Sequence, residues 1–188
     1  MAYINKYDTD GKCSAEGHNA EKSFVELAED KAFEVTAATR NANMFSHVDF
    51  ILKKSSEDGD EPLTLKVDVK SRKRTSRKDK KFNDDWIWLE FRNVQGKNGW
   101  MKGESTHIAF EREKEFVLVP RLELYKWAKQ EIIKRYGNCD NMSIRCVAKN
   151  SRDSKYKCYT RYGRQDLLTQ VNYKEMLGGI NNIEIWNK

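Results

Sequence analysis

The sequence predicts a mixed α/β protein, with a central mixed β-sheet flanked by helices in a single domain over residues 1–188. Several segments of strand length alternate apolar and polar residues, whereas two longer segments carry apolar residues at helical spacing. The chain has 188 residues, two prolines and no internal repeat, which fits one hydrophobic core of ordinary size.

A helix and two strands are expected first. After a polar leader through about Glu16, residues 19–31 predict a helix with an apolar stripe formed by Ala20, Phe24, Leu27 and Ala28. Residues 33–39 have the composition of a strand. Residues 47–52 alternate apolar and polar side chains and predict a second strand, with Asp49 in its middle.

The clearest strand covers residues 63–70. Its apolar side chains face one way, and because side chains alternate along a strand, Asp68 and Lys70 share the opposite face. Residues 86–92 alternate again and predict another strand.

The second half is expected to contain shorter elements around one long helix. Strands over residues 107–111 and 115–119 precede a helix from Pro120 to Tyr136, because proline suits a helix start and Gly137 a helix end. The remaining expectations are strands at 144–148, 157–160 and 183–186 and a short helix at 172–177.

Composition excludes several classes of protein. Hydrophobic residues make up 38% and charged residues 34%, which is typical of a folded globular chain. No apolar run is long enough for a membrane span, and the N-terminus lacks the apolar stretch of a signal peptide, so we expect no membrane partner and a cytoplasmic location. The four cysteines match no zinc-ligand spacing and are interpreted as reduced thiols.

Positive charge is concentrated in one segment. The net charge is +6, yet residues 70–81, called the basic run below, read KSRKRTSRKDKK and carry +7, which leaves about −1 for the rest of the chain. Such a cluster is expected to contact phosphates through Arg72, Lys73, Arg74, Arg77 and Lys78. A solvated loop without a partner is the alternative.

A set of acids and one lysine could carry phosphodiester hydrolysis. Divalent metals such as Mg²⁺ prefer carboxylate oxygens, and a lysine nearby can position water and offset negative charge. Asp68 and Lys70 share a strand face, Asp49 lies within an apolar run, and Glu21 borders the buried face of the first helix. An Asp–Lys pair facing solvent, a turn-capping Asp49 and a surface Glu21, with Glu26 as its rival, are the alternatives.

The order of a helical glutamate, Asp49 and then Asp68-Val69-Lys70 resembles the PD-(D/E)XK nuclease superfamily, which has the restriction-endonuclease-like fold. Gly17-His18-Asn19-Ala20-Glu21 also resembles the opening of its Holliday-junction-resolvase branch. The resemblance covers about residues 17–71 and departs from the family where the basic run and a strand follow Lys70, since many members have a helix there.

The resemblance implies a catalytic core at about 17–92, with an accessory part at 93–188. It implies Asp49, Asp68 and the Val69 carbonyl as ligands of Mg²⁺, or of Mn²⁺ in its place, with Glu21 as a further ligand and Lys70 orienting water. A general likeness to small phage nucleases implies a phage or mobile-element origin, with action in the host cytoplasm.

Aromatic side chains follow the basic run. Trp86, Trp88 and Arg92 share a face of the strand at 86–92, where rings and a guanidinium can contact bases or backbone; two core tryptophans under a helix are the alternative.

The expected function is therefore a metal-dependent deoxyribonuclease, with DNA as partner and a possible homodimer if both strands of a duplex are cut. The alternatives are a non-catalytic nucleic-acid-binding protein with the same fold, or an interaction protein whose basic run binds an acidic partner.

Overall fold

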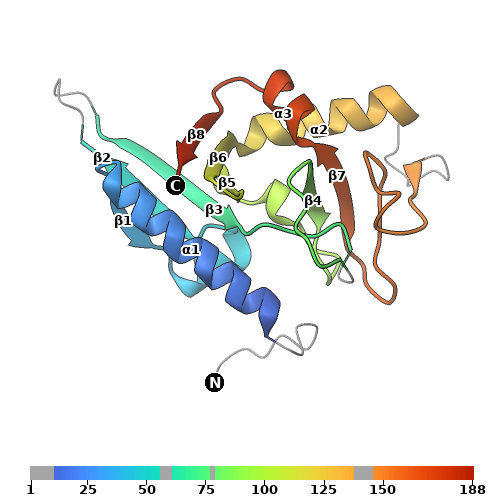
Figure 1. Cartoon of the computed structure of the whole chain (residues 1–188), viewed down its shortest axis with the longest axis horizontal. Coiled ribbons are helices and arrows are strands. Elements are labelled where there is room, and N and C mark those ends of the chain that lie inside the picture. Colours follow the sequence, from blue (N-terminus) through green and yellow to red (C-terminus); the bar gives the residue numbers. More distant parts are fainter. Residues whose placement is uncertain (1–10, 56–60, 77–78, 138–145) are drawn as a thin grey trace.

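The computed structural model describes residues 11–55, 61–76, 79–137 and 146–188 (Figure 1). Its elements are, in chain order, α1 (Lys12–Asp30), β1 (Glu34–Ala37), the π-helical turn η1 (Ala42–Ser46), β2 (Phe50–Lys54), β3 (Leu63–Lys70), β4 (Trp86–Arg92), the 3-10 turn η2 (Trp100–Lys102), β5 (His107–Glu111), β6 (Glu115–Pro120), α2 (Arg121–Tyr136), β7 (Leu167–Asn172), α3 (Tyr173–Gly179) and β8 (Glu184–Asn187). The expected mixed α/β class is confirmed.

Six strands form one mixed sheet in the order β1-β2-β3-β5-β6-β8, and β4 and β7 form a separate antiparallel ribbon. β3 and β5 are parallel, whereas the other neighbours in the large sheet are antiparallel. Parallel neighbours need a crossover connection. The chain between Lys70 and His107 makes this crossover, and it carries the basic run and β4.

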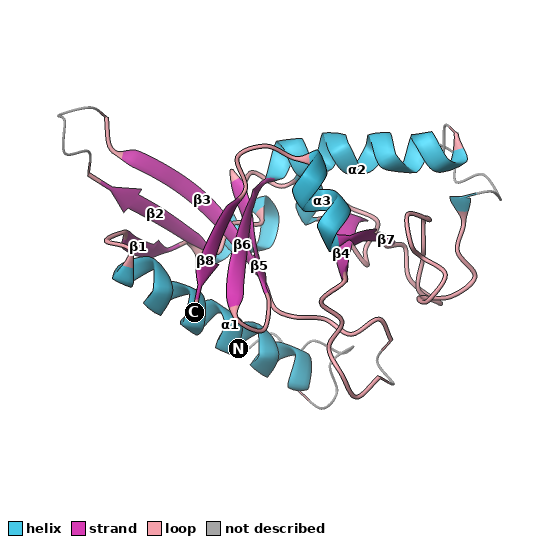
Figure 2. Ribbon diagram, turned by 45° about the horizontal axis from the view of Figure 1, so that its top comes forward, coloured by secondary structure: helices cyan, strands magenta, loops and turns pink. Residues whose placement is uncertain are grey.

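Two hydrophobic cores lie on opposite faces of the six-stranded sheet. Successive residues of β6 alternate between them, because Phe116 and Leu118 pack with α1 while Val117 and Val119 pack with the other core. Figures 1 and 2 show α1 across one face and α2, α3 and the β4–β7 ribbon on the other side. The sheet is therefore covered on both faces, as a mixed α/β fold requires.

α1 begins at Lys12, seven residues before the expected start. Its buried residues are Ala20, Phe24 and Ala28, so the predicted apolar stripe is confirmed. The helix before Ala20 has no buried residue, and a sequence without an apolar face gives no periodic signal there. This early part of α1 extends beyond the sheet and supplies Glu16 to the candidate site described below.

The strands at 63–70, 86–92 and 107–111 match their expected bounds, and those at 34–37, 50–54, 115–120 and 184–187 differ by a few residues. The expected strands around 144–148 and 157–160 are wrong where the structure describes them, since isolated bridges occur there instead. β7 was not expected. Its residues 168–171 are all buried, so no alternation marked it, and two of them are the polar residues Thr169 and Gln170.

Candidate active site

Asp68, the acid of β3, is deeply buried, with only 2% of its surface exposed. It lies on the sheet face opposite Val67 and Val69, whose side chains pack against α1. Its Oδ1 contacts the ammonium group of Lys70 directly. Its Oδ2 is buried and has no hydrogen-bond partner among the described residues. A buried carboxylate oxygen without a partner is unfavourable, which indicates a place for a cation or a proton.

Asp49 lies immediately before β2 and not in the middle of a strand, because the strand begins at Phe50. The Asp49 backbone N–H donates to the Val67 carbonyl at 2.8 Å, and the Asp49 carboxylate lies near enough to Asp68 to interact with it. The Val69 backbone N–H donates to Asp49 Oδ2 at 2.7 Å, and the amide of Asn43 in η1 donates to Oδ1. Asp49 therefore also satisfies a backbone amide of β3 beside the start of β2.

Charge and burial change the acidity of the central pair. Burial raises the pKa of Asp68 to about 7, since Lys70 only partly opposes it and the neighbouring Asp49 carboxylate adds to the rise. Burial alone lowers the pKa of Lys70, but the charges of Asp68 and Asp49 outweigh this effect and raise it. The Lys70 ammonium lies 5.4 Å from the centre of the Trp100 ring. Lys70 is therefore held as a cation between acids and an aromatic face.

Glu21 approaches the site from α1. Burial and then the charge of Asp49 raise the pKa of Glu21, although the hydrogen bond from His18 opposes this. His18 Nδ1 lies 3.5 Å from Glu21 Oε2. Glu26, its rival, is exposed and lies 3.9 Å from Lys22. Of the two glutamates, only Glu21 interacts with the acids of the site.

Sequence reasoning missed two residues near Lys70. Glu90 of β4 is half-buried, and burial raises its pKa while Lys70 opposes the rise. Glu90 shares a strand face with Trp86 and Trp88 by the period-two rule, which was the available signal. His47 follows η1, and burial together with the charge of Lys70 lowers its pKa. Both residues interact with Lys70 and belong to segments other than β3.

The turn that carries Asn43 and His47 fits closely against η2. A Cβ added to Gly103 would lie 2.7 Å from the Ser46 carbonyl oxygen and 2.8 Å from the His47 Cβ. The Glu104 backbone N–H also donates to the Ser46 carbonyl at 2.7 Å. A glycine is therefore required for this turn to approach and to place Asn43 beside Asp49.

A hard divalent cation or a proton would each satisfy the buried Asp68 Oδ2, which has no partner among the described residues. Asp49 already accepts two hydrogen bonds, but each carboxylate oxygen has a second lone pair. Among the described residues, no group of three or more His, Cys, Asp or Glu side chains forms a metal-binding cluster. A ligand set of Glu21, Asp49, Asp68 and the Val69 carbonyl therefore stays a prediction.

The arginines of the basic run have partners within the chain. Arg72 forms a two-bond ion pair with Asp84 at 3.1 and 2.9 Å, and Arg74 pairs with Glu16 of α1 at 2.8 Å. Both guanidinium groups also lie over the Phe82 ring, at 4.7 and 4.2 Å from its centre. The charge count of the basic run therefore overstates the positive charge it presents to a partner.

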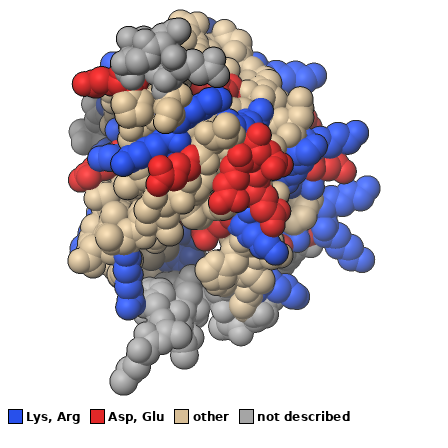
Figure 3. Space-filling view, turned by 90° about the vertical axis from the view of Figure 1, so that its left-hand side faces the viewer, with Lys and Arg blue, Asp and Glu red and all other residues tan. Residues whose placement is uncertain are grey.

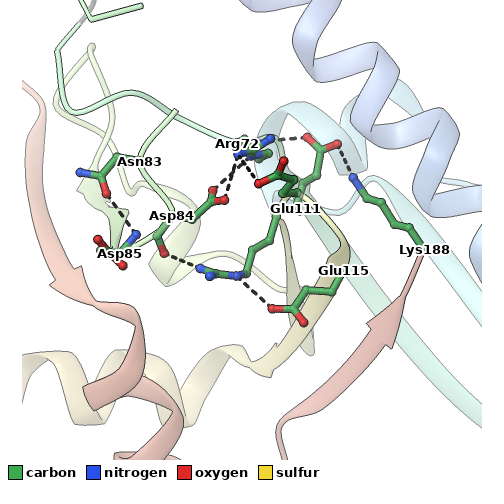
Figure 4. Close-up of polar contacts among 9 residues, drawn as sticks. Arg72, Asn83, Asp84, Asp85, Glu111, Glu115 and Lys188 are labelled. Carbon is green, nitrogen blue, oxygen red and sulfur yellow. Dashed lines mark hydrogen bonds and ion pairs between the residues drawn. The ribbon is translucent and has the colours of Figure 1, made fainter. Parts of the chain in front are cut away.

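Figure 4 shows how this segment is tied to the large sheet. The Arg72 backbone N–H donates to Glu111 Oε2 at 3.2 Å, and Lys188 lies 2.8 Å from Glu111 Oε1. Arg112 donates to the Asp84 carbonyl and to Glu115. The crossover is thus fixed to β5, to the start of β6 and to the chain beyond β8.

The other predicted nucleic-acid contacts differ from one another. Lys73 is exposed and donates to the Ser71 hydroxyl at 2.9 Å, whereas Arg77 and Lys78 lie outside the described residues. Trp88 is half-buried, and its indole N–H donates to the Arg74 carbonyl at 3.1 Å. Arg92 donates to the Gln165 carbonyl at 2.8 Å, and a β-bulge separates it from Glu90.

A cleft of about 1090 Å³ opens beside Lys70. It lies between the start of α1, the basic run, β4 and the segment of residues 151–168. Nine lysines or arginines line it against five acids, together with the rings of Trp86, Trp88, Trp100, Phe110 and Tyr159. Glu90 is part of the same lining.

On the molecular face shown in Figure 3, acidic and basic side chains lie next to one another without a continuous basic field.

Two further expectations concern the whole chain. Cys146 is disulfide-bonded, so the interpretation of four reduced thiols is wrong for this residue, while the buried Cys158 carries a free thiol. No helix in the described part of the chain is long and apolar enough to cross a membrane.

Comparisons of the chain with protein-family models, curated proteins and solved structures give no significant match.

Proposed function

We propose that this chain is a Mg²⁺-dependent nuclease that hydrolyses phosphodiester bonds in DNA. The observation that carries the proposal is the buried Asp68, whose Oδ2 lacks a partner among the described residues. Asp68 interacts with Asp49 and contacts Lys70, which lines a cleft of basic and aromatic residues. An acid of this kind, with a pKa of about 7, is more typical of a functional site than of a structural ion pair.

Asp49 and Asp68 are the proposed ligands of Mg²⁺, with Mn²⁺ able to replace it, and the Val69 carbonyl and Glu21 complete the set. When bound, the metal supplies Lewis-acid stabilisation of phosphoryl charge and lowers the pKa of bound water. The protein must deliver Asp68 as a carboxylate for this role. A nearby cation favours the charged form, so Lys70 opposes the effect of burial on Asp68.

Lys70 has a second role in the proposal. Its ammonium group donates hydrogen bonds from three positions, and only one is needed for Asp68. It lines the cleft, so the others are available to orient a water and to offset charge on the phosphoryl oxygens. Trp100 holds one side of the ammonium group, which limits its positions.

Membership of the PD-(D/E)XK superfamily is part of the same proposal. Support comes from the order α1, β1, β2 and β3, from the interaction of Asp49 with Asp68 and from a parallel neighbour of β3. The crossover after Lys70 contains β4 and η2 among its described residues, where many members have a helix. This departure changes the surroundings of the site and leaves its acids in place.

A cleavage assay tests the proposal. Purified protein is incubated with supercoiled, linear and branched DNA, with Mg²⁺, with Mn²⁺ and with chelator. We expect products only with metal, and we expect Lys70→Ala to lose cleavage. Because Lys70 favours the charged form of Asp68, metal binding is compared by calorimetry at about pH 9, where Asp68 is ionised in both proteins, and should be retained, since lysine is not a ligand. Cleavage that persists in chelator, or metal affinity that disappears with Lys70→Ala, contradicts the assigned roles.

The second candidate is a nucleic-acid-binding protein without catalysis. It is favoured by the absence of a ready-made three-residue metal cluster in the described part of the chain and by the hydrogen bonds that Asp49 already makes. In that case the acids would hold Val69 and Lys70 in place. Tight DNA binding with no metal-dependent product in the assay above would identify this second function.

A further inference from the structure

We propose that the cleft binds an unpaired strand of nucleic acid, with Trp88 and Tyr159 contacting a base and Arg161 contacting a phosphate. The proposal names the substrate class for the nuclease site and in that respect rests on the proposed function. Binding of the strand itself does not require cleavage, so the two can fail separately.

The segment of residues 151–168 lines one side of the cleft, and its Arg152 forms an ion pair with Asp79 of the basic run. Tyr159 is fixed in this wall by two backbone hydrogen bonds with Leu168, at 2.8 and 2.9 Å. Leu168 belongs to β7, which pairs with β4, so the wall is continuous with the strand that carries Trp88 and Glu90. Tyr159 is therefore held at a set position relative to Lys70.

Arg161 is placed by a buried acid. Its backbone N–H donates to Asp166 Oδ1 at 2.9 Å, and its Nε donates to Asp166 Oδ2. Asp166 has no exposed surface, whereas the Arg161 side chain is 30% exposed and lines the cleft. The charges of Lys70 and of Arg161 both act on Glu90, so the two cations flank this acid. A guanidinium held through its Nε side suits phosphate oxygens, which it binds with good geometry.

The aromatic pair offers a stacking surface. The ring centres of Trp88 and Tyr159 lie 6.1 Å apart and the rings are tilted by 43°. Both residues are half-buried and line the cleft. The Trp88 indole is fixed by its hydrogen bond to the Arg74 carbonyl. Stacking on such rings stabilises single strands with little dependence on sequence.

An unpaired strand suits this cleft better than a duplex. In a duplex the base faces are covered by their neighbours, so aromatic rings inside a recess gain nothing from it, whereas exposed bases of a single strand can stack on them. A duplex is held mainly through phosphates by unpaired basic groups. Arg72 and Arg74 instead use terminal nitrogens of their guanidinium groups to pair with Asp84 and Glu16, whereas the pair of Arg161 with Asp166 uses Nε.

The test measures binding in chelator, so that no cleavage interferes. Fluorescently labelled oligothymidylate, oligouridylate and a duplex of equal length are titrated with the full chain. We expect at least one single strand to bind about tenfold or more tightly than the duplex. Comparison of the two oligomers distinguishes DNA from RNA as the source of the strand. Duplex binding that equals or exceeds both single strands overturns the proposal.

Variants test the contribution of the Tyr159 ring to binding separately from that of the Arg161 charge. Tyr159→Ala should weaken single-strand binding by about tenfold, whereas Tyr159→Phe keeps the ring and should bind as wild type. Tyr162→Ala removes a fully exposed tyrosine of the same segment that does not line the cleft, and serves as the control. If Tyr159→Ala and Tyr162→Ala bind alike, base stacking is absent and the proposal is wrong.

Arg161→Gln is independent of the aromatic pair. It should weaken binding and reduce the slope of log affinity against log salt by about 0.7 on single strands. Lys126→Gln removes a positive charge from an exposed site on α2, outside the cleft lining, and should leave the slope unchanged. Thermal melting confirms that each variant is folded. A slope that Arg161→Gln does not change excludes the phosphate contact.

Ring-dependent single-strand binding without metal-dependent cleavage would remove the nuclease function and keep this inference. If Tyr159→Ala changes neither metal-dependent cleavage nor single-strand binding, the nuclease function is kept and this inference is wrong.

Discussion

β3 and the basic run that continues from it differ in how their charges are used. β3 contributes Asp68 and Lys70, which contact each other, and the buried Oδ2 of Asp68 has no partner in the part of the chain that the structure describes. The basic run has many charges, yet Arg72 and Arg74 are paired with acids of the same chain. One buried, partly unsatisfied acid is therefore stronger evidence of function here than a long cluster of cations, because burial makes each unpaired charge costly.

Replacing Asp68 gives the largest expected effect on the β3 side of the comparison. Asp68→Asn should lower metal-dependent cleavage by about three orders of magnitude, since stabilisation of transition-state charge by a metal is worth several kcal/mol. Asp30→Asn changes an exposed acid of α1 in the same way and should keep full activity. Steady-state cleavage rates of the two variants provide the measurement, and equal rates would remove Asp68 from the site.

Asp68 should also make the stability of the metal-free protein depend on pH. Burial raises its pKa from the ordinary value of 3.8 to about 7 in the folded state, so the folded protein holds this proton more tightly than the unfolded chain. This proton adds on the order of 4 kcal/mol to the free energy of unfolding. The addition is complete below about pH 4 and is lost as the pH rises through about 7. Denaturant unfolding in chelator from pH 4 to 8 measures this loss.

Asp68→Asn should remove that part of the pH dependence, whereas Asp30→Asn should retain it. A pH profile that is the same in wild type and Asp68→Asn shows that the Asp68 proton is not coupled to folding.

Glu21 and Glu26 of α1 test how far the site extends. Glu21→Gln should lower activity or metal affinity by about 10- to 100-fold, which is the usual cost of losing a residue that supports a metal ligand. Glu26→Gln makes the same chemical change on an exposed side of the same helix and should have no effect. Metal titrations of cleavage rate compare them directly, and equal losses for both would indicate a nonspecific effect of helix charge.

The smallest effects are expected within the basic run. Lys73→Ala removes an exposed cation and should reduce the salt slope of DNA binding by about 0.7 on single strands or 0.9 on duplex. Arg72→Ala should mainly lower the unfolding free energy, because it leaves Asp84 without its ion pair and Phe82 without its covering guanidinium. Salt titrations and thermal melts of both variants separate the two roles. A full slope change for Arg72→Ala would show that its ion pair opens on binding.

The sequence predicted the β3 side of the site well and the opposite wall of the cleft poorly. β3 faces a core on one side and carries charges on the other, so its period of two is clean and Asp68 and Lys70 were assigned to one face. The early part of α1, with Glu16, has no buried face and therefore no helical pattern. β7 is buried throughout, and its polar Thr169 and Gln170 hid it further.

Pairing across long separations was also out of reach. The bond between Arg74 and Glu16 joins the crossover to the start of α1, and nothing in local composition shows that these residues meet. Glu90 fitted the alternation of its strand, but its interaction with Lys70 depends on the position of β4 in the fold. Local periodicity therefore predicts faces of elements, whereas the partners of a charge depend on tertiary packing.

The stacking of Trp186 on Phe24 links the two ends of the described chain. The centres of these two rings lie 5.6 Å apart and the rings are almost parallel. The Phe33 ring also stacks on Trp186, with the ring centres 5.5 Å apart. α1 also packs on β1 and β3, so Trp186 of β8 supplies part of the surface under the helix. We expect amides of α1 and β8 to exchange with solvent as one cooperative unit. A chain cut before Glu184 would keep Asp68 and Lys70 on β3 but would remove Trp186 from the surface that holds the helix carrying Glu21.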